Sequence, residues 1–337
     1  MDFPLRTEVS IEPAQWDFNY QTPAMFLGSC FSDHMGGALL RSKFPVQLNP
    51  FGVLYNPISL SMALNRILDQ QEVSNDELVF HDGLWHSFYF HGSFSNSSKE
   101  TLIEQCNRAI AEASTFLKSA QFLFITLGTA WVFRHQESGK IVSNCHKIPA
   151  SNFERFRLSI DEIREQWLPL LSRIHQFNPK LKIIFTVSPI RHFKDGAHEN
   201  QLSKSTLLLA IDEITQAYPV EQIGYFPSYE LMNDELRDYR FYKEDMVHIA
   251  ETGIRFIFEK FKFAFFSKET TECFNQIQPI ILAKEHKILN KNDQSVTIFA
   301  EKTIEKITYL QKKYPNVNFE EEMKHFIDLA GLEKGFY

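Results

Sequence analysis

The run Phe122-Leu-Phe-Ile-Thr-Leu127, closed by Gly128, is the stretch of sequence that decides the fold. A continuous, largely apolar run of this length is typical of a strand buried on both faces, as in a parallel sheet. Further short runs of β-forming residues lie on either side of it, at residues 24–27, 46–48, 181–187 and 223–226. The sequence therefore predicts several buried strands.

Amphipathic stretches with helix-start signals separate these strands. Asn56 precedes Pro57 as a capping residue precedes a first-turn proline, and Ser97–Glu100 and Ser159–Glu162 have capping-box spacing. The helices expected cover residues 32–43, 56–70, 97–118, 159–177 and 199–218. Two hairpins are expected, at residues 81–94 and 132–143. Alternating strands and helices predict a doubly wound α/β sheet rather than a sandwich or a bundle.

The last part of the chain has a different composition. From about residue 267 it has few strand signals and more Lys, Glu, Asn and Gln, with helical spacing over 271–289, 295–314 and 320–332. We therefore expect an α/β domain over residues 1–265 and a helical C-terminal extension over residues 266–337.

Composition and charge exclude several classes of function. The 337 residues include 42 acidic and 35 basic side chains, a net charge of −7, which disfavours nucleic acid and anionic membrane surfaces as partners. The 4 cysteines form no CxxC pair and fit free thiols in a reducing compartment. There is no apolar signal region and no apolar stretch of about 18 residues. We expect a soluble, cytoplasmic protein.

The loops after the buried strands carry the candidate site, because ligands bind at the carboxyl ends of strands in open α/β sheets. Cys30 lies between a strand and a helix, where the helix dipole favours a thiolate nucleophile. His248 could take the thiol proton and Asp245 could orient it. Two alternatives stay open for the first position: Cys30 is a buried small apolar residue, or Ser29 is the nucleophile. Asp245 could instead cap a helix that begins near Glu251.

Other residues have weaker claims. His192 follows a strand and could contact substrate, and Arg237 and Arg240 could bind an anion or form a structural network. Cys145 and His146 are adjacent, which strains a tetrahedral site, so no metal site is expected. No phosphate-binding glycine motif follows a strand, so nucleotide and dinucleotide chemistry are unsupported and no cofactor is required.

The sequence resembles a known family at several places: GSCF at residues 28–31, NPFGVLYNP at 49–57, LGTAWVF at 127–133, NCHK at 144–147, SPIRH at 188–192, YFPSYE at 225–230, LRDYRFY at 236–242 and DMVH at 245–248. This set looks like the GSCFA domain family, of the SGNH or GDSL-like hydrolase superfamily, over roughly residues 20–262. The resemblance implies a three-layer α/β/α fold with a parallel five-stranded sheet in flavodoxin-like order. Gly28, Gly128 and Ser188 should lie along one edge of that sheet.

The resemblance also implies roles for single residues. The SGNH nucleophile falls on Cys30, the oxyanion-hole glycine on Gly52, and the acid–base pair on Asp245 and His248. Ala130 stands where the superfamily has an oxyanion-hole asparagine. Gly128 itself is expected among the oxyanion- or substrate-binding residues. Thr129, Trp131 or Asn144 should supply the missing donor, with Asn144 preferred because an amide donates without losing a proton. The alternative is that Asn144 only caps the end of the hairpin near Cys145.

The function that this reading favours is acyl transfer by a Cys30–His248–Asp245 triad. The enzyme would be an ester or thioester hydrolase, or an acyltransferase acting on a sugar or another hydroxyl, with acyl-CoA as a possible co-substrate. The alternative is a non-catalytic small-molecule-binding or scaffold protein that retains the fold, which the alanine at position 130 favours.

Overall fold

The apolar run around Phe124 is the central strand of a parallel sheet. The computed structural model describes residues 7–286 and 294–332, and all side chains of β5 (Phe122–Leu127) are buried in it. The sheet has 5 strands in the order β10-β9-β5-β1-β2. Its other strands are β1 (Ala24–Gly28), β2 (Val46–Leu48), β9 (Lys182–Val187) and β10 (Ile223–Tyr225). All neighbours are parallel, so the predicted flavodoxin-like order is confirmed.

The register of this sheet brings the strand ends together. Gly28 pairs with Thr126 across β1 and β5, and Leu127 pairs with Val187 across β5 and β9. The segments after Gly28, Leu127 and Val187 therefore leave one edge of the sheet, as expected of parallel strands.

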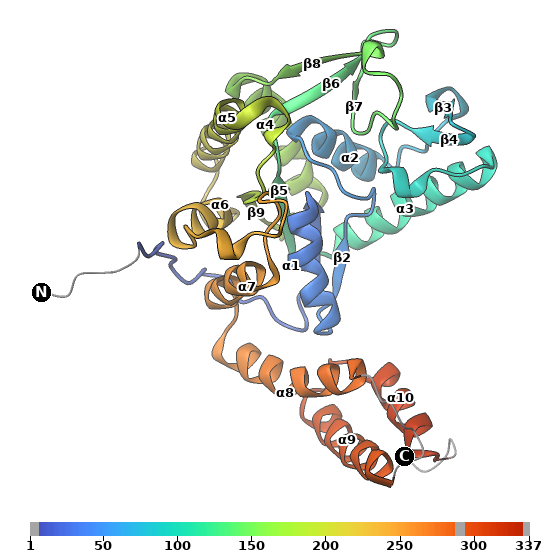
Figure 1. Cartoon of the computed structure of the whole chain (residues 1–337), viewed down its shortest axis with the longest axis vertical. Helices are drawn as coiled ribbons and strands as arrows, with labels where there is room; N and C mark the ends of the chain where they lie inside the picture. Colours follow the sequence, from blue (N-terminus) through green and yellow to red (C-terminus); the bar gives the residue numbers. More distant parts are fainter. Residues whose placement is uncertain (1–6, 287–293, 333–337) are drawn as a thin grey trace, which may run out of the picture. The chain divides into compact units, whose positions relative to one another are not determined.

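Helices cover both faces of the sheet, as Figure 1 shows. Leu27, Leu123 and other side chains of alternate sheet positions pack in one large apolar core with α2, α3, α4 and α5. On the other face Phe26 and Phe124 stack with ring centroids 4.4 Å apart, and Phe261 of α7 packs on Phe124 at 5.3 Å. The α-helices of this part of the chain are α1 (Cys30–Arg41), α2 (Pro57–Asp69), α3 (Lys99–Ser119), α4 (Ile160–Phe177), α5 (Gly196–Gln216), α6 (Ser228–Glu230) and α7 (Glu251–Phe265).

Of the three predicted capping signals, two are correct and one is shifted. Asn56 accepts a hydrogen bond from the Ser59 amide at 2.8 Å, and Ser159 with Glu162 forms the expected capping box. The helix expected to start at Ser97 begins one residue later, because Ser98 is the residue whose hydroxyl accepts the Thr101 amide at 3.2 Å.

Two small antiparallel sheets interrupt the alternating pattern. The first hairpin, β3 (Leu78–His81) and β4 (Leu84–Ser87), turns at Asp82-Gly83 but is shorter than expected, since residues 92–94 form a 3₁₀ turn. The second hairpin, β6 (Trp131–His135) and β7 (Ile141–Val142), has a third strand, β8 (Phe153–Arg157). The sequence analysis missed β8, because its charged residues leave no regular alternation of apolar and polar side chains.

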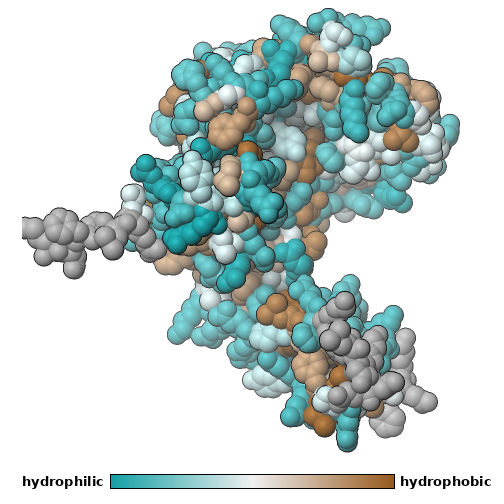
Figure 2. Space-filling model, in the orientation of Figure 1, coloured by the Kyte–Doolittle hydropathy of each residue, from teal (hydrophilic) through white to brown (hydrophobic). Residues whose placement is uncertain are grey.

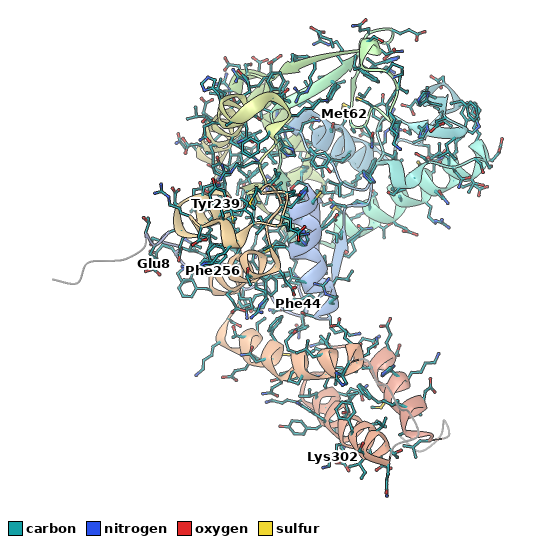
Figure 3. All side chains as sticks on the ribbon, in the orientation of Figure 1. Glu8, Phe44, Met62, Tyr239, Phe256 and Lys302 are labelled. Atoms are coloured by element: carbon teal, nitrogen blue, oxygen red, sulfur yellow. The ribbon has the colours of Figure 1, made fainter. Side chains whose placement is uncertain are left out.

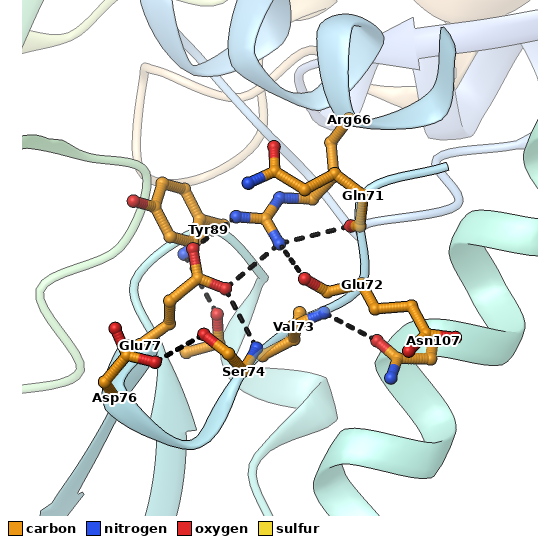
Figure 4. A network of polar contacts seen from close by, with 10 residues as sticks. Arg66, Gln71, Glu72, Val73, Ser74, Asp76, Glu77, Tyr89 and Asn107 are labelled. Atoms are coloured by element: carbon orange, nitrogen blue, oxygen red, sulfur yellow. Dashed lines mark hydrogen bonds and ion pairs between the residues drawn. The ribbon is translucent and has the colours of Figure 1, made fainter. Parts of the chain in front are cut away.

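A buried ion pair fixes the C-terminal end of α2. Arg66 Nη2 lies 2.6 Å from Glu77 Oε1, and its Nη1 donates to the carbonyl oxygens of Gln71 and Glu72. Figure 4 shows these contacts together with the ring of Tyr89, whose centroid lies 4.5 Å from the guanidinium. Hydrogen bonds that involve a charged group are stronger than those between neutral groups. These contacts therefore fix the position of α2, and with it the position of Asn56, the capping residue at its N-terminal end.

The chain divides into two compact units, which we describe separately. Among the described residues, the first takes in residues 7–12, 23–37 and 46–261, and the second residues 13–22, 38–45, 262–286 and 294–332. The second unit thus includes three segments that the sequence analysis assigned to the first domain, residues 13–22, 38–45 and 262–265. On the face that Figure 2 shows, the α/β unit is covered mainly by hydrophilic side chains.

The second unit is helical, with α8 (Lys268–Glu285), α9 (Gln294–Lys313) and α10 (Glu320–Ala330). The expected end of the first of these helices, Leu289, lies outside the described residues. Glu322 is buried between Lys43 at 2.7 Å and Lys284 at 3.0 Å. No helix within residues 7–286 and 294–332 is both long and apolar enough to span a bilayer.

Candidate active site

The turn between β1 and α1 requires glycine. Gly28 has φ +142°, and a Cβ there would lie 2.3 Å from the carbonyl oxygen of Thr126 in the neighbouring strand. The Gly28 amide donates to Asn49 Oδ1 at 2.8 Å. This tight turn places Cys30 at the sheet edge as the first residue of α1, where its own amide has no acceptor within the helix.

A cavity of about 400 Å³ lies at this edge of the sheet. Six of the predicted site residues line it, namely Ser29, Cys30, Thr129, Trp131, His192 and His248. The other lining residues are Tyr55, Asn56, Phe133, Val142, Ser143, Arg155, Ser188, Ile190 and Lys194. The candidate nucleophile and the candidate base therefore face the same space.

The hydroxyl of Tyr55 is the hydrogen-bond partner of the Cys30 thiol. The oxygen and the sulfur are 3.5 Å apart. Burial raises the pKa of Tyr55 well above its usual value, and the contact with Cys30 raises it further. Tyr55 therefore stays protonated and can donate to a thiolate. Within the described ranges no hydrogen bond joins the Cys30 sulfur to His248, so the predicted direct contact is not formed here.

His248 is held by Asp245 in the predicted way. Asp245 Oδ2 lies 2.6 Å from His248 Nδ1, and Oδ1 accepts the backbone amides of His248 at 2.8 Å and Val247 at 2.9 Å. These hydrogen bonds, the amides first, lower the pKa of Asp245 to about 2. A carboxylate that stays ionised on Nδ1 keeps the proton there and leaves Nε2 as the acceptor of a neutral ring.

Two predicted oxyanion donors are already occupied. The Gly52 amide donates to the Asn49 carbonyl at 2.7 Å, and the Gly128 amide donates to the Tyr55 carbonyl at 2.7 Å. Both glycines lie outside the lining of the cavity. Their backbone turns consume the N–H groups, so the expectation that either supports an oxyanion is wrong for this structure.

Asn144 is also placed elsewhere. Its Oδ1 accepts the His146 amide at 2.9 Å, which is the capping role that the sequence left as the alternative. Its neighbour Ser143 lines the cavity instead. Thr129 lines the cavity, but its hydroxyl accepts the Trp131 amide at 3.1 Å and contacts Ser203 Oγ at 3.1 Å.

Asn56 is a site residue that sequence reasoning recognised only as a helix cap. Its Oδ1 is fixed by the Ser59 amide, which identifies the remaining atom of the carboxamide as the Nδ2 donor. Asn56 is buried, with 6% of its surface exposed, and it lines the same cavity as Cys30. Asn56 lies in the NPFGVLYNP stretch that contributes to the family resemblance, and this was the signal available in the sequence.

A buried lysine joins the ends of the two central strands. Lys204 of α5 is fully buried, and its Nζ donates to the carbonyl oxygens of Gly128 at 2.7 Å and Ser188 at 2.6 Å. Burial lowers its pKa to about 7. The lysine therefore holds together the carboxyl ends of β5 and β9, which lead into the loops that line the cavity.

The two other histidines near the edge are held neutral at ordinary pH. Burial first, and then the charges of Lys204, His248 and Arg155, lower the pKa of His192 to about 4. Burial likewise lowers the pKa of His146 to about 4, while its Nε2 contacts the Ser87 carbonyl at 2.8 Å. In the part of the chain that the structure describes, no cluster of three His, Cys, Asp or Glu could hold a metal.

A second, larger cavity of about 1190 Å³ has a different lining. Its lining includes Glu8, Arg237, Arg240 and Phe256. Figure 3 labels Glu8 and Phe256, which lie near each other in that view. Arg240 Nε lies 3.6 Å from Asp238 Oδ2. The two arginines of the sequence analysis thus belong to a mixed-charge surface away from Cys30.

Two family models match the chain. The model of the GSCFA family matches residues 23–261, and that of the GSCFA domain protein C-terminal domain matches residues 277–328. No curated protein matches the chain. A crystal structure of a carbohydrate esterase family 3 protein from Talaromyces cellulolyticus is similar over 77% of this chain and 99% of its own, with 10% identity and a TM-score of 0.33.

Proposed function

This chain belongs to the GSCFA family, and for it we propose an acyl-transfer activity with Cys30 as nucleophile, His248 as general base and Asp245 as the residue that orients the base. The observation that carries the proposal is that Cys30 and His248 line one cavity while Asp245 holds His248 Nδ1 at 2.6 Å. The flavodoxin-like sheet with its Gly28 turn supports an SGNH-like origin.

The first half-reaction forms a thioester on Cys30. His248 Nε2 takes the thiol proton, and the thiolate attacks the acyl carbonyl carbon as the carbonyl electron pair moves to oxygen. The Cys30 amide and Asn56 Nδ2 donate to that oxyanion, and both come from residues that line the cavity. The intermediate expels an alcohol or a thiol, which takes its proton from His248.

The second half-reaction releases the acyl group. Water or a substrate hydroxyl gives its proton to His248 and attacks the thioester carbonyl, and the Cys30 thiolate leaves. Exchange between a thioester donor and Cys30 replaces one C–S bond with another, so an acyl-CoA-like donor is energetically suitable. A transferase using a sugar hydroxyl and a hydrolase using water share these steps.

Tyr55 has a defined part in this scheme. Its hydroxyl, 3.5 Å from the sulfur, would donate to the thiolate whenever the proton is on His248. Catalytic hydrogen bonds are often long in unliganded enzymes and tighten when substrate binds. The thiol can therefore rotate from Tyr55 toward His248 in the complex.

The test is turnover of S-acetyl-N-acetylcysteamine and of p-nitrophenyl acetate by four proteins. Wild type should release thiol or phenol, and Cys30→Ala should be at the uncatalysed rate. His248→Ala should lose about 100- to 10,000-fold, the contribution that a general base usually makes. Cys145→Ser is the matched control, since this thiol does not line the cavity. Equal turnover by Cys30→Ala and wild type would refute the proposal.

A non-catalytic binding protein is the second candidate function. It is favoured by two observations: the Cys30 sulfur contacts Tyr55 rather than His248, and the Gly52 and Gly128 amides are consumed by backbone turns. This candidate predicts that ligand binds without forming an acyl adduct. Intact-protein mass spectrometry after mixing with the thioester separates the two, because only the enzyme gains an acyl mass on Cys30.

A further inference from the structure

The Cys30 cavity has a charge opposite to that of the whole chain. Arg155 and Lys194 line it, and none of its lining residues is aspartate or glutamate. The chain as a whole carries a net charge of −7. A partly enclosed cavity with one sign of charge concentrates ligands of the opposite sign.

Lys194 forms no ion pair within the described residues that would explain its position at the cavity. It is exposed, and its Nζ lies 5.7 Å from the ring centroid of Phe133, another lining residue. No carboxylate lies within ion-pair distance of it among residues 7–286 and 294–332. Its ammonium group is therefore available at the cavity.

Arg155 is held rigidly in the same wall. Asp195 pairs with both terminal nitrogens of its guanidinium, with Oδ2 2.6 Å from Nη2. The guanidinium also lies 4.5 Å from the Trp131 ring centroid and 5.4 Å from that of Phe133. Asp195 itself is not part of the lining, so it offsets the charge of Arg155 but leaves no carboxylate at the cavity surface.

Three polar atoms of the lining residues lack a hydrogen-bond partner in the described part of the chain. They are Arg155 Nε, Trp131 Nε1 and Ser143 Oγ. A buried donor without an acceptor is unfavourable, because it has lost its hydrogen bonds to water and gained none in the protein. All three residues belong to the inserted sheet β6–β8 or border it, so the unmet donors gather in one wall.

From these observations we propose that the substrate carries an anionic group, a carboxylate or a phosphate, which binds beside Arg155 and Lys194 while its acyl carbon lies at Cys30. The second half of this statement rests on the proposed function. Guanidinium and ammonium groups are the usual ligands of such anions in proteins. The rings of Trp131 and Phe133 provide apolar contact for the chain that joins the two ends of the substrate.

The charge preference can be measured with two alkylating reagents of nearly equal size. Iodoacetate is anionic and iodoacetamide is neutral, and both form a thioether with Cys30 as iodide leaves. We take the rate with iodoacetate divided by the rate with iodoacetamide, for Cys30 and for free N-acetylcysteine. The ratio for Cys30 should be at least about 10-fold higher than the ratio for N-acetylcysteine, which is within the range that electrostatic attraction gives. Mass spectrometry of the Cys30 peptide measures each rate.

The Lys194→Met variant tests the assignment to this wall. The ratio should fall by about 3-fold or more. A change in the thiolate fraction of Cys30 would alter both rates equally and so would leave the ratio unchanged. Lys180→Met is the matched control, because Lys180 is equally exposed and is not a lining residue. A ratio equal to that of N-acetylcysteine in the wild type, or unchanged in Lys194→Met, would overturn the proposal.

Failure of the proposed function is recognised separately. If Cys30 reacts with neither reagent, acyl transfer through its thiol fails, and the anion site is then tested by calorimetry on Cys30→Ala. Succinate should bind at least about 10-fold more tightly than succinamide, and Lys194→Met should remove that difference. Equal affinities for the two ligands would overturn the anion site.

Matched substrates show which end of the substrate holds the charge. S-succinyl- and S-acetyl-N-acetylcysteamine differ only in an acyl carboxylate, while acetyl phosphopantetheine and acetyl pantetheine differ only in a leaving-group phosphate. A kcat/KM preference of about 10-fold for the anionic member of one pair, lost in Lys194→Met, supports the proposal and identifies the source. No preference in either pair would contradict it.

Discussion

The hydroxyl oxygen of Tyr55 lies 3.5 Å from the sulfur of Cys30 and is the thiol's hydrogen-bond partner. A hydrogen bond to a charged group contributes about 1.5–3 kcal/mol. Because Tyr55 stays protonated, it stabilises the thiolate, and Tyr55→Phe should slow alkylation of Cys30 by iodoacetamide at pH 7 by about 10-fold.

A control must separate the loss of the hydrogen bond from a change in how accessible the Cys30 sulfur is to the reagent. At pH 10 the rate difference between wild type and Tyr55→Phe should narrow, because free thiols ionise near pH 8.5. A variant that reacts faster than wild type at pH 7 would mean that the Tyr55 hydroxyl shields the sulfur instead of stabilising its anion.

The thiols of this chain should react selectively. Burial raises the pKa of Cys106 to about 12 and that of Cys273 to about 11, and it raises the pKa of Cys145 as well. Cys30 lines a cavity at a helix start. At pH 7 substoichiometric iodoacetamide should therefore modify Cys30 first, as peptide mass spectrometry would show. Earlier modification of Cys145 would argue against a special reactivity of Cys30.

Asn56 has two roles that substitutions can separate. Asn56→Asp retains an oxygen that can accept the Ser59 amide and cap α2, but it removes the Nδ2 donor. Losing one oxyanion donor costs about 100- to 1,000-fold in kcat. We expect that loss with little change in Tm, whereas Asn56→Ala should also lose about 1 kcal/mol of stability with its helix cap. Thioester hydrolysis and thermal unfolding measure the two effects.

Wild-type turnover by Asn56→Asp would exclude Nδ2 as an oxyanion donor. Asn144→Ala is the informative comparison, since the Asn144 oxygen accepts the His146 amide and the residue does not line the cavity. We expect that variant to retain kcat.

The fold could be predicted from local patterns because buried parallel strands are uninterrupted apolar runs. Residues 122–127 identified the central strand, and the Gly28, Gly128 and Ser188 turns then fixed the edge that carries the site. The strand β8 (Phe153–Arg157) was missed, because Phe153 and Phe156 lie on opposite faces among charged residues, so that no alternation of apolar and polar residues marks it.

The site was only partly predictable, because hydrogen-bond partners depend on tertiary structure. The Asp245–His248 pair is local, and it was proposed from its spacing together with the family resemblance. The occupation of the Gly52 amide by Asn49 could not be read from a motif. Neither could the cavity positions of Arg155 and Lys194, which come from segments far from Cys30 in sequence.

Lys204 gives the molecule a pH-dependent stability with a predictable sign. Burial lowers its pKa in the folded state from 10.5 to about 7. Between those values the unfolded chain binds a proton that the folded protein does not, so the free energy of unfolding rises with pH by up to about 1.4 kcal/mol per pH unit. The contribution is complete above about pH 10.5 and is lost as pH falls to 7, below which both states are protonated.

Comparison with Lys204→Met isolates this contribution from those of other titrating groups. Methionine fills a similar volume without a titratable group, but it leaves the carbonyl oxygens of Gly128 and Ser188 without their donor. The free energy of unfolding of the wild type minus that of the variant should therefore increase from pH 7 to pH 10 in urea titrations and level off below pH 7. Lys180→Met, at an exposed lysine, should show no such trend. A difference that decreases over this range would mean that Lys204 is charged in the folded protein and stabilises the strand ends as an ammonium ion.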